Sequence, residues 1–285
     1  MEQILCTMRR AVAEYGRSGD GSLECVSVTT GGDALRTAVY RLYQKDTSAA
    51  PIVMPPELDA LAARLELTNS TAARISDISC TGEGRWRICI KLRTRSDGYD
   101  ETVRTLYRRM DCPVTPDPMT VDGRLRAALG TADGTMIQLG AELEDGAATT
   151  VKTYYALRSG NDRHGRFPPP EVLLPPVEDV WRICGGKGPV LDMETAGALA
   201  ALGYHPFLLG LNQQGDRGEL KLYHMLYPYQ PDRLRNTADA ALEVMGLCLP
   251  SLTAGMDEAG MYLRGIGRWC SPQQSGWKLY FSEKE

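Results

Sequence analysis

The sequence predicts an α+β fold in which a ten-stranded antiparallel β-barrel is surrounded by α-helices, within one domain over residues 1–285. Three observations support this prediction. Strand-like segments come in five pairs, each joined by a short polar or glycine-containing turn. Helix-like segments lie between the pairs. A basic residue followed two positions later by a tyrosine recurs on the second strand of most pairs.

The five strand pairs are expected to be hairpins. Their turns contain Gly31-Gly32-Asp33, Gly82-Glu83-Gly84, Asp145-Gly146, Gly215-Asp216-Arg217-Gly218 and the segment 271–276. The pairs are 22–29 with 36–44, 72–80 with 85–94, 135–143 with 149–158, 206–212 with 218–227, and 258–266 with 275–282.

Helical spacing of apolar residues, as in Leu58, Leu61 and Leu65, predicts helices between the hairpins. The expected ranges are about 3–15, 57–67, 100–110, 119–129, 175–184, 193–202 and 232–247. Asp192 is a plausible N-cap for the sixth of these. The prolines at 168–170 and 175–176 are interpreted as an extended connector.

The recurring triplets place cations and phenol rings on one face of the sheet, because residues two apart on a strand point to the same side. The triplets are Arg41-Leu42-Tyr43, Lys152-Thr153-Tyr154, Lys221-Leu222-Tyr223 and Lys278-Leu279-Tyr280, with Lys91-Leu92-Arg93 as a variant. Such a face is a poor hydrophobic core and a good lining for a polyanion pocket. His224 follows Tyr223 and is expected to point outward in a structural role.

Ten twisted strands tend to curl or close, and closure removes the edges of the sheet. A ten-stranded barrel is wider than side chains alone can fill. We therefore expect an internal polar chamber with helices packed outside it.

Composition limits the possible partners. A net charge of -4 argues against a broad nucleic-acid surface. No apolar run approaches the length of a membrane span, and the N-terminus lacks signal-peptide character. The eight cysteines are scattered without metal-ligand spacing, which is typical of reduced cytoplasmic proteins.

The chain resembles prenyltransferases of the antiparallel αββα-barrel class (the ABBA fold, or PT barrel), and in particular the cyanobactin-type peptide prenyltransferases. The similar segments are Gly19-Asp20-Gly21-Ser22-Leu23-Glu24, Arg85-Trp86-Arg87-Ile88-Cys89-Ile90-Lys91, His205-Pro206-Phe207-Leu208-Leu209-Gly210-Leu211 and Trp277-Lys278-Leu279-Tyr280. The repeat pattern covers nearly the whole chain, whereas identity at each motif is low.

The resemblance implies roles for the basic and aromatic residues. An allylic diphosphate that ionises needs cations around its leaving group and electron-rich rings around the carbocation. The expected diphosphate ligands are Arg41, Arg87, Lys91, Lys152, Lys221 and Lys278. The expected carbocation shield is Tyr154, Tyr223 and Tyr280. Solvated outward side chains are the alternative interpretation of these residues.

Two further positions take their interpretation from the resemblance alone. Glu24 matches a glutamate that orients or deprotonates the acceptor, and an exposed strand residue is the alternative. Leu208 matches a position that limits the length of the prenyl pocket, or else it packs in the barrel wall.

The activity implied is transfer of a dimethylallyl or geranyl group to a side chain of a ribosomal, often cyclic, peptide. Prenylation of a small indole or phenol on the same fold is the alternative, and a non-enzymatic isoprenoid-binding barrel is a third. The resemblance also implies Mg²⁺ bound through the diphosphate, although the sequence shows no dedicated metal cage. We expect a monomer with an allylic diphosphate and a peptide as partners, without nucleic acid or membrane.

Overall fold

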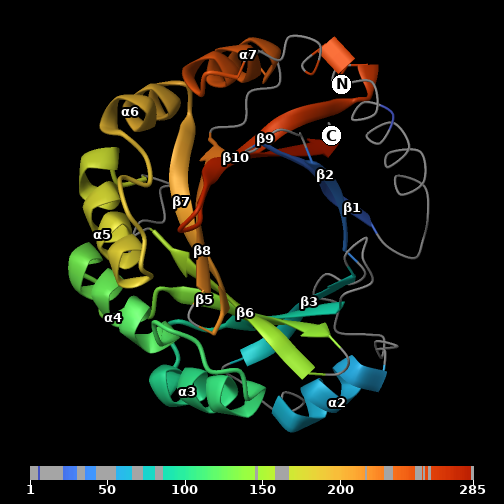
Figure 1. Ribbon diagram of the computed structural model, residues 1–285, viewed down its shortest axis with the longest axis vertical. Coiled ribbons are helices and arrows are strands. Elements are labelled where there is room, and N and C mark those ends of the chain that lie inside the picture. Colours follow the sequence, from blue (N-terminus) through green and yellow to red (C-terminus); the bar gives the residue numbers. More distant parts are fainter. Residues whose placement is uncertain are drawn as a thin grey trace.

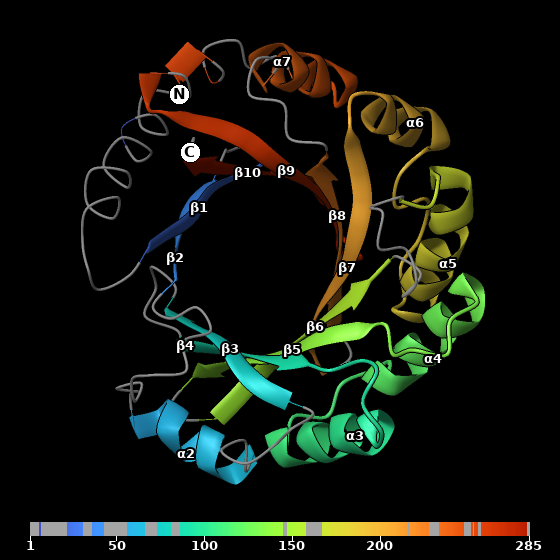
Figure 2. The same cartoon turned by 180° about the vertical axis from the view of Figure 1, so that it is seen from behind.

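A computed structural model gives the architecture (Figures 1 and 2). It describes residues 6, 22–30, 36–42, 56–65, 73–80, 86–144, 147–157, 167–215, 217–227, 234–247, 252, 254–255 and 258–283. The strands are β1 Ser22–Thr29, β2 Arg36–Leu42, β3 Ala73–Cys80, β4 Trp86–Leu92, β5 Met136–Glu144, β6 Ala147–Ala156, β7 Tyr204–Gln214, β8 Arg217–Leu226, β9 Met261–Cys270 and β10 Ser275–Glu283.

All strands pair antiparallel in one sheet with the order β2-β1-β10-β9-β8-β7-β6-β5-β4-β3. The sheet curls on itself, so that β2 and β3, at the two ends of this order, come near one another (Figure 1). The prediction of a curled antiparallel sheet inside a layer of helices is confirmed. Hydrogen-bonded closure of ten strands into a complete barrel stays a prediction.

The helices lie outside the curl of the sheet (Figures 1 and 2). They are α2 Pro56–Leu65, α3 Tyr99–Met110, α4 Pro118–Leu129, α5 Pro170–Ile183, α6 Met193–Ala201 and α7 Leu234–Val244. The Asp192 side chain accepts a hydrogen bond from the Thr195 amide at 2.8 Å, which confirms the predicted cap. The helix predicted near 3–15 lies outside the described residues apart from Cys6. No described helix has the length and apolar character needed to cross a membrane.

The connector interpretation of the two proline clusters was wrong for α5, which begins at Pro170 and contains Pro175 and Pro176. A proline suits the first turn of a helix, where its missing N–H has no partner in any case. The two interior prolines leave the carbonyls of Glu171 and Val172 without helical donors, and both residues are exposed to water. Burial of the apolar face of α5 offsets this loss. The buried residues of that face include Leu173, Leu174, Val177, Val180 and Trp181.

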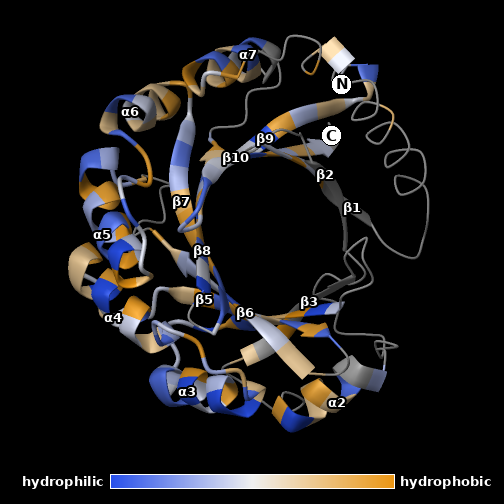
Figure 3. Cartoon of the chain, in the orientation of Figure 1, coloured by the Kyte–Doolittle hydropathy of each residue, from blue (hydrophilic) through white to orange (hydrophobic). Residues whose placement is uncertain are grey.

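The main core lies between the outer face of the sheet and the helices. Along β8, Leu220 and Leu222 are fully buried on this outer face. Lys221 and Tyr223, which alternate with them along the strand, line an internal cavity. Hydropathy alternates along the strands in the same way (Figure 3). The two faces of each strand therefore serve different purposes, and the inner face is left for polar chemistry.

A buried carboxylate ties α4 to the start of β5. Asp122 Oδ1 accepts hydrogen bonds from the amides of Thr135 at 2.7 Å and Met136 at 2.8 Å, and from the Thr135 hydroxyl at 2.6 Å. Its Oδ2 is 2.6 Å from the guanidinium of Arg126. This network satisfies a charge that would be costly to bury alone, and it fixes the strand that carries Gln138 and Glu142.

Candidate active site

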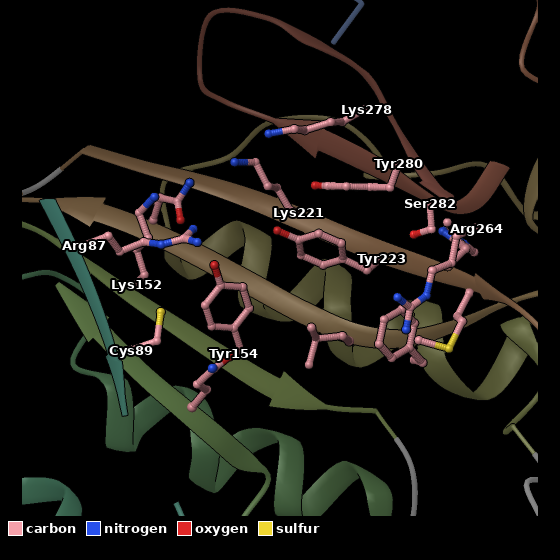
Figure 4. Close-up of a pocket in the computed structure, with 17 residues that line it drawn as sticks. Arg87, Cys89, Lys152, Tyr154, Lys221, Tyr223, Arg264, Lys278, Tyr280 and Ser282 are labelled. Carbon is pink, nitrogen blue, oxygen red and sulfur yellow. The ribbon is translucent and has the colours of Figure 1, made fainter. Parts of the chain in front are cut away.

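A cavity of about 300 Å³ lies inside the curl of the sheet (Figure 4). Its lining comes from β4 to β10, mostly from their inner faces. The lining residues are Arg87, Cys89, Gln138, Lys152, Tyr154, Phe207, Leu208, Asn212, Lys221, Tyr223, His224, Met225, Arg264, Gly265, Lys278, Tyr280 and Ser282.

Four cationic side chains gather at one end of this cavity, contributed by β4, β6, β8 and β10 (Figure 4). They are Arg87, Lys152, Lys221 and Lys278. In the strand register, each lysine pairs with a glycine on the preceding strand. The pairs are Lys152 with Gly140, Lys221 with Gly210, and Lys278 with Gly267. These four predicted residues therefore share one cavity and form what we call the basic end.

Next to the basic end lies a band of three phenol rings, those of Tyr154, Tyr223 and Tyr280 (Figure 4). The Tyr223 ring is central, with its centroid 6.3 Å from that of Tyr154 and 5.7 Å from that of Tyr280. The ammonium of Lys278 lies 5.6 Å from the centroid of the Tyr280 ring. Cationic and aromatic groups thus adjoin, as the recurring triplets predict.

Glycines on the intervening strand allow the rings to pack this closely. A Cβ at Gly210 would lie 2.9 Å from Cε2 of Tyr223 and 3.4 Å from Cδ1 of Tyr154. A Cβ at Gly267 would lie 3.3 Å from Cε2 of Tyr280. Sequence reasoning missed these glycines. The signal that could have found them is their position on the strands that flank each triplet.

Sequence reasoning also missed two carboxylates. Glu142 forms an ion pair with Lys152, and both side chains are largely buried. Glu219 Oε1 is 2.5 Å from Lys221 Nζ and accepts a hydrogen bond from Asn212 Nδ2 at 3.0 Å. The spacing Glu219-Leu220-Lys221 places both charges on one strand face, so the second pair could have been found from the sequence.

Electrostatic forces on Lys152 act in both directions. Burial lowers the pKa of its ammonium below the ordinary lysine value, and the positive charges of Arg87 and Lys221 lower it further. The carboxylate of Glu142 opposes both effects and raises this pKa. The charge on Lys152 therefore depends on its carboxylate partner.

The opposite end of the cavity is less polar. Phe207, Leu208 and Met225 form part of its wall. The exposed Arg264 lies at this end beside Ser282 (Figure 4). Leu208 lines the cavity here, and its predicted role in limiting the length of the prenyl pocket stays a prediction. The cavity is thus cationic at one end and phenolic in the middle, and its far end combines an apolar wall with Arg264 and Ser282.

The structure places one predicted residue differently and leaves two others untested. Lys91 is exposed and is not part of the cavity lining. Arg41 pairs through its backbone with Leu23, and Glu24 falls at the register shift between Leu23 and Cys25. The side chains of Arg41 and Glu24 lie outside the described residues, so their roles stay predictions.

The predicted Mg²⁺ finds no ready-made cage in this part of the molecule. Across the described residues, no group of three or more His, Cys, Asp or Glu side chains is arranged to hold a metal ion. The two carboxylates near the cavity, those of Glu142 and Glu219, form ion pairs with lysines. These side chains do not fit a protein-held magnesium ion, and Mg²⁺ bound through a diphosphate stays a prediction.

No protein-family model and no curated protein sequence matches the chain. Two solved structures have similar architecture. The crystal structure of AnaPT from Neosartorya fischeri is 12% identical, with a TM-score of 0.52, and the match covers 96% of this chain and 82% of that one. The 5-dimethylallyltryptophan synthase from Streptomyces coelicolor is 13% identical, with a TM-score of 0.56, covering 91% and 81%. The chain therefore has the fold of the aromatic prenyltransferases.

Proposed function

We propose that this protein transfers a prenyl group from an allylic diphosphate to an aromatic acceptor. The observation that carries the proposal is the single cavity in which a cationic end adjoins a band of tyrosine rings. A diphosphate fits the basic end by charge, and an isoprenoid chain fits the rings and the apolar wall by polarity. The shared fold with prenyltransferases supports the same activity.

The reaction follows from this arrangement. The allylic C–O bond breaks, and the diphosphate keeps the bonding electrons, stabilised by Arg87, Lys152, Lys221 and Lys278. The allyl cation forms beside the tyrosine rings, which stabilise it by cation–π attraction and keep water away. The acceptor ring supplies an electron pair to the new bond and then loses a proton to a base. Glu24 is our candidate for that base.

The acceptor is the finer part of the proposal. The name 5-dimethylallyltryptophan synthase describes a dimethylallyl donor and a tryptophan acceptor for that protein. This favours the small aromatic acceptor and the dimethylallyl donor for the present chain. The peptide acceptor suggested by the cyanobactin resemblance stays a second candidate, because the exposed Arg264 lies at an end of the cavity that a chain segment could reach.

A direct assay tests both candidates. The protein is incubated with dimethylallyl or geranyl diphosphate and with tryptophan, tyrosine, or linear and cyclic peptides that contain them. Mass spectrometry then detects the added prenyl group. Parallel reactions with Mg²⁺ or with a chelator test the magnesium expectation. Absence of prenylated product with every acceptor would contradict the proposed function.

Lys221→Ala tests the role of the basic end in this assay, and Lys187→Ala is its control. Removal of one basic-end cation is expected to lower the rate at least tenfold, since one charge-assisted contact to the leaving group is worth about 1.5–3 kcal/mol. Lys187→Ala, which removes an exposed lysine that does not line the cavity, should leave the rate unchanged.

A further inference from the structure

A second cavity, of about 290 Å³, adjoins the basic end on the side of the hairpin turns. It includes Ser271, Pro272 and Gln273 from the turn between β9 and β10. Lys152 and Asn212 line both cavities, whereas Glu142 and Glu219 line only the second one. Seen from the first cavity, which we call the donor cavity, the carboxylates of Glu142 and Glu219 thus lie behind Lys152 and Lys221.

We propose that Glu142 and Glu219 are positioning residues for the donor diphosphate: they hold Lys152 and Lys221 as fixed, charged groups at the basic end. Each lysine is bound from behind by a carboxylate that does not line the donor cavity. The donor therefore meets preorganised cations and need not displace their partners. The inference rests on the proposed function only in that the cavity must bind a diphosphate.

The need for such partners follows from crowding and burial. Lys152 is faced by Arg87 from β4, Glu142 from β5, and Lys221 from β8, with Asn212 beside it on β7. An isolated ammonium in this setting would be driven toward its neutral form. A neutral lysine would attract no phosphate oxygen. Glu142 prevents this loss of charge because it is the negative group paired with the ammonium.

The ion pair between Glu219 and Lys221 holds the Lys221 side chain in place. Glu219 is held in turn by Asn212, whose side-chain amide donates to the carboxylate oxygen that contacts Lys221. This chain of contacts joins β7 to β8 at the level of the basic end. Removing the Glu219 charge should therefore release the Lys221 side chain from its fixed position.

The test measures binding of inorganic pyrophosphate by titration calorimetry at a series of pH values from neutral to alkaline. Binding to the unmodified protein is expected to weaken at alkaline pH as Lys152 loses its proton. In Glu142→Gln this weakening should begin at lower pH, with affinity about tenfold below that of the unmodified protein for each unit by which the pKa falls. Glu144→Gln is the matched control, because Glu144 is exposed and lines neither cavity.

A rescue variant separates this role from a structural one. Arginine does not lose its charge in proteins, so Glu142→Gln combined with Lys152→Arg should bind pyrophosphate with little alkaline loss. Glu219→Gln should weaken binding at all pH values through the released Lys221. Thermal unfolding of each variant checks that the fold is intact.

The outcomes distinguish the two proposals. Pyrophosphate binding with the same pH dependence in Glu142→Gln and in the unmodified protein would overturn the positioning role and leave prenyl transfer standing. Failure of the unmodified protein to bind pyrophosphate would overturn the donor site itself. Alkaline loss that persists in the double variant would assign the titration to another group and contradict the inference.

Discussion

Tyr223 is the residue on which the aromatic band depends. Its ring lies between those of Tyr154 and Tyr280, and Phe207 packs edge-on against it with the centroids 6.5 Å apart. It is therefore the ring that an allyl cation leaving the basic end would meet in the middle of the cavity.

We expect Tyr223→Leu to lower the rate of prenyl transfer about 30-fold, since a desolvated cation–π contact is worth about 2 kcal/mol. Tyr223→Phe keeps the ring and should retain most of the activity. A less protected cation reacts with water to give the prenyl alcohol. Chromatography of the prenylated acceptor and of the prenyl alcohol therefore measures the effect. Equal rates for the leucine and phenylalanine variants would contradict a role for the ring.

His224 illustrates the opposite face of the same strand. Its register partner is the core residue Ile266, and it is buried, as its predicted outward direction requires. Burial lowers the pKa of His224 from the usual 6.5 to about 4. As the pH falls, His224 therefore binds a proton near pH 6.5 in the unfolded chain, but only near pH 4 in the folded chain.

Stability should accordingly fall as the pH drops below about 6.5, and the loss from this residue should level off near pH 4 at roughly 3 kcal/mol. His224→Leu removes the titrating group. Urea unfolding at several pH values should then show a smaller acid loss in the variant than in the unmodified protein. Parallel stability curves for the two proteins across this range would exclude His224 as the acid-sensitive group.

At the scale of elements, the hairpins were predictable because turn residues and two-residue periodicity agree locally. The segments predicted at 135–143 and 149–158 are β5 Met136–Glu144 and β6 Ala147–Ala156. The helix α5 was predicted too short because Pro175 and Pro176 look like helix breakers, and only tertiary burial of the neighbouring apolar residues overrides that preference. Local sequence carries no information on that burial.

The glycines between the triplets are also element-scale features, since they matter only once strands pair. We expect Gly210→Ala to reduce prenyl transfer by about tenfold or more, because the new methyl group would displace the Tyr223 ring and misplace the reacting carbon. Gly197→Ala on α6 is the control, since no atom lies within 4 Å of the added Cβ.

Steady-state kinetics and thermal unfolding of both variants provide the measurements. Gly197→Ala should keep full activity and gain stability, as expected for alanine in an exposed helix. If Gly210→Ala keeps full activity as well, the close approach of the strand to the rings has no bearing on catalysis.

At the scale of the whole molecule, the sequence repeat predicted that Lys152, Lys221 and Lys278 meet. These lysines recur in successive hairpins, so curling of the sheet brings them to one cavity. Arg87, which joins them there, was predicted from the family resemblance and not from the repeat. The exposure of Lys91 was not predictable because it depends on the offset between neighbouring strands. The backbone register of Arg41 was not predictable because it depends on the irregularity in the pairing of β1 with β2. Glu142 escaped notice because its lysine is on the adjacent strand.

The cavity as a whole has positive charge at both ends. Arg264, at the start of β9, and Lys278, on β10, are separated along the strand direction, with the tyrosine band between them (Figure 4). If the diphosphate occupies the basic end, a second anionic group in the cavity would be best placed near Arg264 and the hydroxyl of Ser282. An acceptor with a carboxylate, such as a free amino acid, meets that condition.

We therefore expect Arg264→Gln to lower kcat/KM for tryptophan about 10- to 100-fold, the range for loss of a charge-assisted hydrogen bond. Tryptamine has the same indole without the carboxylate, so its kcat/KM should be unchanged, and Arg264→Lys should restore part of the preference for tryptophan. Competition between the two acceptors, followed by mass spectrometry, measures the preference within one reaction. Equal losses for tryptophan and tryptamine would mean that Arg264 supports the barrel mouth and has no contact with an acceptor carboxylate.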